Sequence, residues 1–95
     1  MTTTKRRPPA TRSSARLRGD YQILVELVAK VRDEAGKTQR DVADQLGQQQ
    51  SWYAKSESGE RRMDMLEVLA ILDALGVDPG DFIRRLRRAL KKAAH

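Results

Sequence analysis

The sequence predicts an all-α fold of about five helices joined by short turns. Apolar residues recur at helical spacing, glycines follow the periodic segments, and no segment alternates apolar and polar residues as a strand does. The chain has 95 residues, of which 39% are hydrophobic, and no internal repeat is visible. That length suits one small domain with a modest core.

The first 19 residues predict a disordered basic arm. They combine Thr, Ser, Pro, Arg and Gly with one large aliphatic residue, Leu17, and they contain basic residues but no acidic one. Such a composition buries too little apolar surface to offset the entropy lost on ordering. We therefore expect the arm over residues 1–19 and a helical domain over residues 20–95.

Capping residues and glycines mark the first two helices. Asp20 is the expected N-cap of the first helix, and Gly36 follows its last apolar position. Thr38 is the expected start of a second, short helix, because Thr38 and Asp41 have the spacing of a capping box. Gly47 is expected to end this helix.

The third and fourth helices are expected at about residues 50–58 and 65–75. Gly59 follows the third helix, and Asp64 with Glu67 has capping-box spacing at the start of the fourth. The fourth segment is almost entirely apolar. We therefore expect it to be the buried centre of the fold.

A fifth helix is predicted to begin at Asp78 and Pro79, with proline in the first helical position, where no backbone donor is needed. It is strongly amphipathic, and no acidic residue occurs after residue 83. Its apolar face consists of Phe82, Ile83, Leu86 and Leu90, and its basic residues are Arg84, Arg85, Arg87, Arg88, Lys91 and Lys92.

Charge is distributed unevenly along the chain. The formal net charge is +6, yet residues 20–83 contain all 13 acidic residues, so two basic ends flank an acidic body. Basic ends favour a polyanion as partner, nucleic acid before an anionic membrane, although a solubilising tail and a solvated helix face are the alternative. We expect the arm and the last helix to provide affinity by neutralising phosphates.

Composition excludes several kinds of chemistry. The chain has no cysteine, and its one histidine is His95, the last residue, so we expect no metal site, no cofactor and no catalysis. The longest apolar run, residues 68–72, is far shorter than the roughly 18 residues needed to span a bilayer, and no stretch resembles a signal peptide. We expect a cytoplasmic protein without membrane contact.

Residues 38–62 carry the most specific signal. Two short helices meet at a tight glycine turn, with the small Ala43 where the second must cross closely, as in a helix-turn-helix. The informative residues are Arg32, Gly36, Thr38, Gln39, Val42, Ala43, Leu46, Gly47, Tyr53, Glu57, Gly59, Arg61, Leu75, Gly76 and Val77. With these residues, about residues 21–83 resemble the phage-repressor and Cro-type helix-turn-helix family, the xenobiotic-response-element class of bacterial transcription regulators.

The resemblance implies a repressor-like five-helix bundle whose helix at residues 50–58 enters the major groove of DNA. Gln50 is suited to adenine, Lys55 to guanine, and Ser51 to either kind of base. Trp52 and Ala54 are expected close to the bases. The plainer alternatives are a solvated cap for the start of this helix, a surface lysine for Lys55, and packing against Tyr53 for Trp52.

Other positions are expected to hold the DNA backbone or the scaffold. The resemblance implies that Gln39 meets a phosphate, and that Arg32 and Glu57 form an ion pair between the first helix and the recognition helix. Lys37, Gln48 and Ser56 depart from the pattern, because relatives have apolar residues there. The full set of expected backbone contacts is Thr38, Gln39, Arg40, Gln49, Arg61 and Arg62, and the structural positions are Arg32, Glu57, Gly59, Ala43 and Gly47.

The first functional hypothesis is a sequence-specific regulator of transcription, a repressor, that binds a pseudo-palindromic double-stranded DNA operator as a homodimer. Leu90 and Ala94 are candidates for the dimer contact. The alternative is the antitoxin of a toxin–antitoxin pair, which binds a toxin protein and its own operator. An adaptor of the transcription machinery or an RNA binder comes third, and an enzyme is the weakest interpretation, because no nucleophile is paired with a base.

Overall fold

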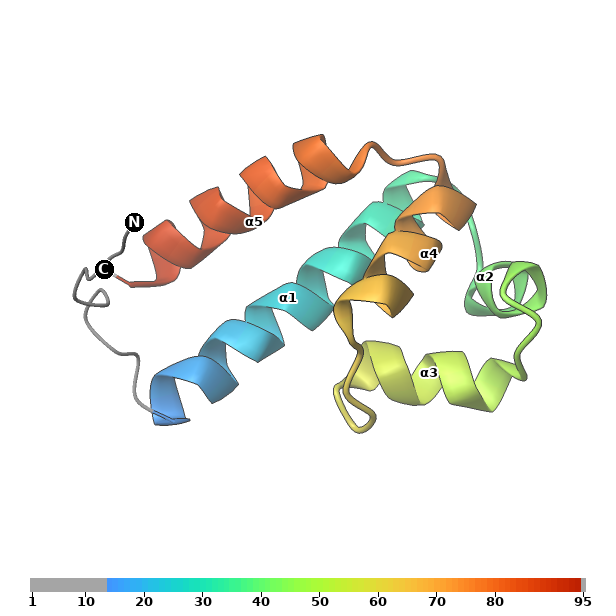
Figure 1. The fold of residues 1–95 in the computed structure, drawn as a ribbon, viewed down its shortest axis with the longest axis horizontal. Coiled ribbons are helices and arrows are strands. Elements are labelled where there is room, and N and C mark those ends of the chain that lie inside the picture. The colour runs from blue at the N-terminus through green and yellow to red at the C-terminus, as the bar shows by residue number, and fades with distance from the viewer. Residues whose placement is uncertain (1–13, 95) are drawn as a thin grey trace, which may run out of the picture.

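The computed structural model describes residues 14–94, and these residues form five helices and no strand (Figure 1). The predicted all-α fold is therefore confirmed. In chain order the helices are α1 (Ser14–Glu34), α2 (Gln39–Gln45), α3 (Gln50–Ser58), α4 (Met65–Leu75) and α5 (Pro79–Ala93).

Helix α1 begins at Ser14 and not at Asp20, so the prediction of an arm as far as residue 19 is wrong for residues 14–19. The remainder of the predicted arm, residues 1–13, lies outside the described residues. Arg16 explains part of the difference, because its Nε lies 3.8 Å from Asp20 Oδ1 one turn along the helix. Asp20 therefore pairs within the helix, and the expected cap is absent.

The other helix starts follow the local sequence as predicted. At α2 the Thr38 hydroxyl accepts the backbone N–H of Asp41 at 3.0 Å, and the Asp41 carboxylate accepts that of Thr38 at 2.8 Å. Asp64 and Glu67 make the same reciprocal pair at α4, at 2.8 and 2.9 Å. At α5 an N-cap aspartate precedes the proline of the first turn.

Glycine sets the connections on either side of α3. Gly47, in the turn after α2, has φ of +68°, and Gly59, at the end of α3, has φ of +87°. Side chains with a Cβ rarely adopt this left-handed region. Both predicted helix ends are therefore fixed by backbone conformation, and the turn from α2 into α3 stays short.

The core consists of one face from each helix. Val28 and Val31 of α1, Ile71 of α4 and Phe82 of α5 are fully or almost fully buried. The complete buried apolar set is Val25, Leu27, Val28, Val31, Val42, Ala43, Tyr53, Met63, Val68, Ile71, Leu72, Leu75 and Phe82.

Helix α4 is less enclosed than its composition predicts. Met65 and Leu66 in its first turn are 63% and 75% exposed, although the rest of the helix supplies four core residues. Ile83 on α5 is 40% exposed, so it does not close the core as its neighbour Phe82 does. Composition indicated how apolar these helices are, but not which turns have a neighbour to pack against.

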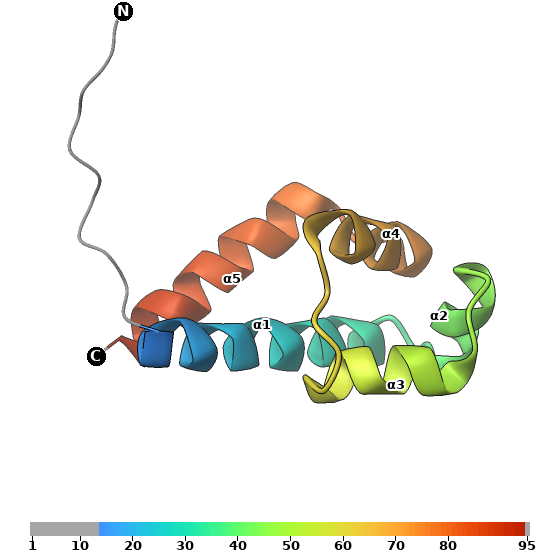
Figure 2. The ribbon, with the colours of Figure 1, turned by 60° about the horizontal axis from the view of Figure 1, so that its bottom comes forward.

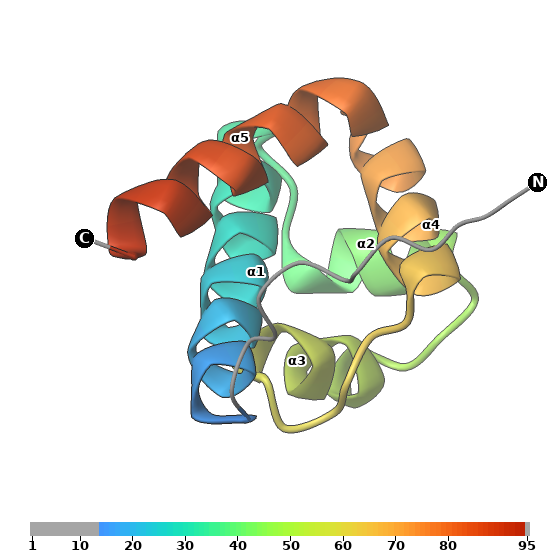
Figure 3. The ribbon, with the colours of Figure 1, turned by 60° about the vertical axis from the view of Figure 1, so that its left-hand side comes forward.

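Helix α1 packs against both α3 and α5. Figures 2 and 3 show α3 on one side of α1 and α5 on another, and α4 packs against α2 and α5. Glu34 at the end of α1 accepts hydrogen bonds of 2.8 and 3.1 Å from Arg85 of α5. Near the other end, the Tyr21 hydroxyl accepts the backbone N–H of Met63 at 2.8 Å, which attaches the α3–α4 connection to α1.

Candidate functional site

Helix α3 has one buried side and one exposed side. Tyr53 and Ser56 are completely buried against the core, whereas Gln50, Ser51 and Lys55 are exposed. Ser51 and Lys55 are four residues apart and lie on the side of the helix opposite this buried pair, while Gln50 is exposed in the first turn. The three side chains expected to contact bases thus share an accessible surface. The other two expected base contacts, Trp52 and Ala54, are half-buried at its margins.

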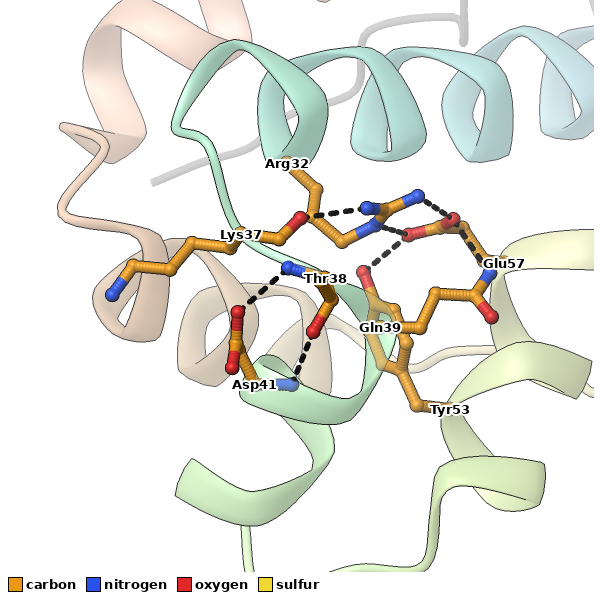
Figure 4. A network of polar contacts seen from close by, with 7 residues as sticks. All are labelled: Arg32, Lys37, Thr38, Gln39, Asp41, Tyr53 and Glu57. Atoms are coloured by element: carbon orange, nitrogen blue, oxygen red, sulfur yellow. Dashed lines mark hydrogen bonds and ion pairs between the residues drawn. The ribbon is translucent and has the colours of Figure 1, made fainter.

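A carboxylate at the end of α3 fixes this orientation (Figure 4). Glu57 accepts hydrogen bonds from Arg32 Nε and Nη2 of α1 at 2.8 and 2.9 Å, so the ion pair implied by the resemblance is present. It also accepts the Tyr53 hydroxyl at 2.6 Å and the Gln39 amide of α2 at 3.0 Å. One carboxylate therefore connects α1, α2 and α3.

The ionisation of Glu57 and Tyr53 follows from this network. Burial alone would raise the pKa of Glu57, but the hydrogen bonds from Arg32, Tyr53 and Gln39 outweigh it and hold the pKa below its ordinary value. Burial, with the neighbouring carboxylate, raises the pKa of Tyr53 well above its ordinary range. The network is therefore a carboxylate with a guanidinium and a neutral phenol at neutral pH.

The start of α2 lies beside the start of α3. Thr38, Gln39, Arg40 and Gln50 line a shallow depression, and Arg40 Nη2 donates to Gln50 Oε1 at 3.4 Å. Gln49 is exposed as the N-cap of α3, and its side chain makes no capping hydrogen bond. Four of the positions expected to contact the DNA backbone thus adjoin the exposed face of α3.

The two arginines after α3 contact aromatic rings. Arg61 lies over the Trp52 ring, with 4.3 Å from Cζ to the ring centroid, and it forms an ion pair with Glu67 of α4. Arg62 lies over the Tyr21 ring of α1 at 4.1 Å. These contacts give both residues a place in the scaffold, which the sequence did not indicate.

Two of the three departures from the family pattern have a structural explanation. Ser56 is buried, but its hydroxyl donates to the Trp52 carbonyl at 3.1 Å and accepts from Arg61 at 3.2 Å. A buried hydroxyl with both partners costs little, so the site tolerates a polar residue. Gln48 is exposed and therefore loses no burial, and Lys37 is half-buried while its carbonyl accepts Arg32 Nη1 at 2.7 Å.

Within residues 14–94, no group of three acidic, cysteine or histidine side chains is arranged to hold a metal ion. In the same part of the chain, no helix is long and apolar enough to cross a membrane.

Comparison with known proteins identifies the class. The Helix-turn-helix domain family matches residues 23–86. Among solved structures, the chain is similar to an XRE-family like protein from Pseudomonas syringae pv. tomato str. DC3000, with 35% sequence identity and a TM-score of 0.71. The alignment covers 76% of this chain and 88% of that one. No curated protein matches the sequence.

The chain therefore belongs to the helix-turn-helix family, and its class is that of DNA-binding regulators. Within this class it is an XRE-like helix-turn-helix protein. The match includes the whole of α2, α3 and α4, the part of the chain that builds the exposed face described above.

Proposed function

We propose that the protein is a sequence-specific repressor of transcription that reads the major groove of double-stranded DNA with α3. The observation that carries this proposal is the division of α3 into a buried, hydrogen-bonded side and an exposed side with Gln50, Ser51 and Lys55. The nine residues of α3 span about 13 Å at 1.5 Å per residue, and the groove is about 12 Å wide.

The exposed side chains supply the donors and acceptors that base edges require. Gln50 pairs with N6 and N7 of adenine, Lys55 donates to O6 or N7 of guanine, and Ser51 accepts or donates according to the base. The exposed edges of Trp52 and Ala54 suit a thymine methyl group or a sugar. These contacts discriminate between sequences because each base pair presents a different pattern in the major groove.

The residues around α3 hold the phosphates. Thr38, Gln39 and Arg40 at the start of α2, with Gln49, face the backbone on one side of the groove, and Arg61 and Arg62 face it on the other. Gln39 donates one amide hydrogen to Glu57, and its second amide hydrogen serves a phosphate oxygen. Arg61 contributes through the part of its guanidinium that Glu67 leaves accessible.

The operator is a pseudo-palindrome bound by a homodimer, with half-sites about one helical turn apart. Leu90, half-buried near the end of α5, and the exposed Ala94 are the proposed subunit contact. No chemical step is assigned to the protein, which acts by binding and uses neither a metal nor a cofactor.

Selection of bound duplexes from a random pool tests the proposal. The expected result is a palindromic consensus with fixed spacing between its halves, recovered at physiological salt. A pool with no enriched sequence would contradict sequence-specific reading. An enriched site without symmetry would contradict the dimer and leave the groove contact standing.

A further inference from the structure

Helix α5 carries a cluster of exposed cations without counter-charges. Arg84 pairs with Asp81 and Arg85 with Glu34, but within residues 14–94 no ion pair forms to the next four cations. All four are exposed. We call them the α5 basic surface, which consists of Arg87, Arg88, Lys91 and Lys92.

Their spacing places these four cations on one side of α5. Arg87 and Lys91 are four residues apart, as are Arg88 and Lys92, so each pair lies in one row along the helix. Like charges at this spacing repel each other and destabilise a helix, an effect that the helix dipole offsets in part near a C-terminus. A polyanion on this side removes the repulsion.

The α5 basic surface faces away from α3. Phe82 is buried and Leu86 packs against the core, so the apolar side of α5 is turned toward α1 and the basic side toward solvent. Figures 2 and 3 show α5 across α1 from α3. A duplex seated on α3 therefore lies on a different side of the domain, and the predicted contribution of the last helix to that same duplex does not fit this geometry.

Two depressions extend the cationic region onto α1. One is lined by Arg16 together with Arg87 and Lys91, and the other by Lys30 together with Arg88 and Lys92. Arg16 also pairs with Asp20, and Glu26 lies in the second depression, so the free positive charge comes mainly from α5. Cations from two helices thus follow the junction of α1 and α5.

We propose that the α5 basic surface binds the phosphate backbone of a second DNA segment, so that one chain holds two duplex segments on different sides. Only the holding of the first segment rests on the function proposed above. Arginine and lysine side chains in a row neutralise successive phosphates and release counterions without reading sequence. Once α3 holds one segment, the remainder of the same DNA is present at high effective concentration.

The arrangement disfavours the other polyanions. A helix that lies on an anionic membrane inserts its apolar face, but Phe82 and Leu86 of α5 are engaged in the core. A protein partner needs a large apolar anchor within the contact, whereas the four side chains of the α5 basic surface are charged and the neighbouring Leu90 is assigned above to the subunit contact. A row of backbone phosphates requires neither an inserted apolar face nor an apolar anchor.

A capture assay tests this inference. An operator duplex is fixed to beads, and a labelled duplex of unrelated sequence is supplied in solution with the full chain. The double variant Arg87→Gln with Lys91→Gln is expected to capture at least fivefold less labelled duplex. It is expected to bind the operator duplex alone within twofold of wild type.

A second double variant, Arg84→Gln with Arg85→Gln, is the matched control. It removes the same charge from the same helix, at positions that are already paired with acids. We expect it to capture labelled duplex as wild type does. Equal losses in the two variants would reduce the effect to net charge and overturn the proposal.

The remaining outcomes separate this inference from the function proposed for α3. Unchanged capture by the Arg87 and Lys91 variant would assign bridging to two recognition helices of a dimer and overturn the proposal. Competition by phosphatidylserine vesicles, but not by free duplex, would reassign the surface to a membrane. If α3 does not bind DNA, the α5 basic surface still contributes to binding of a single unrelated duplex, and the same variant reduces its salt slope by about 2.

Discussion

Arg32 and Glu57 meet through a fork of two hydrogen bonds, Nε to Oε2 at 2.8 Å and Nη2 to Oε1 at 2.9 Å, that joins α1 to α3. The Glu57 side chain is only 5% exposed and that of Arg32 17%. An ion pair this enclosed positions α3 against α1, because either partner alone would be left with an unmatched charge.

Replacing Arg32 with alanine is therefore expected to lower the free energy of unfolding by about 2 to 4 kcal/mol, since Glu57 keeps its burial and loses its cation. Urea denaturation followed by circular dichroism measures the loss. Arg18→Ala, an exposed arginine on the same helix, is the control and should change stability by less than about 0.5 kcal/mol. Equal effects of the two substitutions would contradict a structural role for the fork.

Lowering the pH should reduce the stability of the fold, in part because Glu57 becomes protonated. Its pKa is lower in the folded chain than in the unfolded one, so its contribution is complete above the unfolded value of about 4.3 and is lost as the pH falls through the folded pKa. Unfolding midpoints measured between about pH 7 and 3 should decrease less steeply for Glu57→Gln than for wild type.

Other carboxylates titrate in the same range, so the difference between the two proteins isolates Glu57. Accepted hydrogen bonds also lower the pKa of Glu34, Asp41 and Glu67. These groups are present in both proteins and contribute equally to both curves. Parallel curves would show that Glu57 does not ionise differently in the two states.

The contacts that Arg61 makes should depend on its planar guanidinium group. It stacks on Trp52 and reaches Ser56 and Glu67 at once, which the single ammonium of lysine does not reproduce. Arg61→Lys is expected to lower stability by about 1 kcal/mol, measured as a shift in the thermal midpoint. Arg62→Lys, at a more exposed stacked position, is the comparison and should cost less.

Gln50→Ala should relax base preference without unfolding the domain. Gln50 is exposed, and among the described residues its side chain forms one hydrogen bond, from Arg40 at 3.4 Å. The variant is expected to lose about 1 to 3 kcal/mol of binding energy at one or two base pairs of the selected site. Gln45→Ala, exposed on α2, is the control. Wild-type preference at every position of the site would show that the register of α3 on DNA is different.

Residues 1–13 should add affinity that does not depend on sequence. The deletion that tests them must end at residue 13, because α1 begins at Ser14. Residues 5, 6, 7 and 12 are basic, so the deletion is expected to weaken binding to every duplex and to reduce the salt slope by as much as about 3.6. An unchanged slope would exclude these residues from the contact.

The boundaries of α2 to α5 were predictable because their signals are local. Reciprocal caps at Thr38 and Asp64 and left-handed glycines such as Gly59 act over three or four residues, within reach of sequence inspection. The start of α1 was missed because an aspartate suits both an N-cap and an ion pair within a helix. The exposure of Leu66 was missed because burial depends on what packs against a helix.

The candidate site also has some features that the sequence predicts and others that only the fold determines. The outward positions of Gln50 and Lys55 and the pairing of Arg32 with Glu57 followed from the resemblance in sequence. The contacts from Gln39 to Glu57 and from Arg61 to Trp52 join segments whose distance is set by the fold, and neither has a local signal. Sequence thus predicted which face of α3 is exposed and one ion pair that holds the helix, but not the further contacts made by Gln39 and Arg61.

Trp52 is the one tryptophan of the chain, and it lies half-buried at the margin of the exposed face of α3, beneath Arg61. The indole fluorescence of the chain therefore comes from one residue. Loss of the α3–α4 junction exposes the indole to water, whereas a duplex bound on α3 as proposed would cover its accessible edge. Unlabelled protein consequently carries a built-in optical reporter that distinguishes melting from occupancy by the direction of the spectral shift.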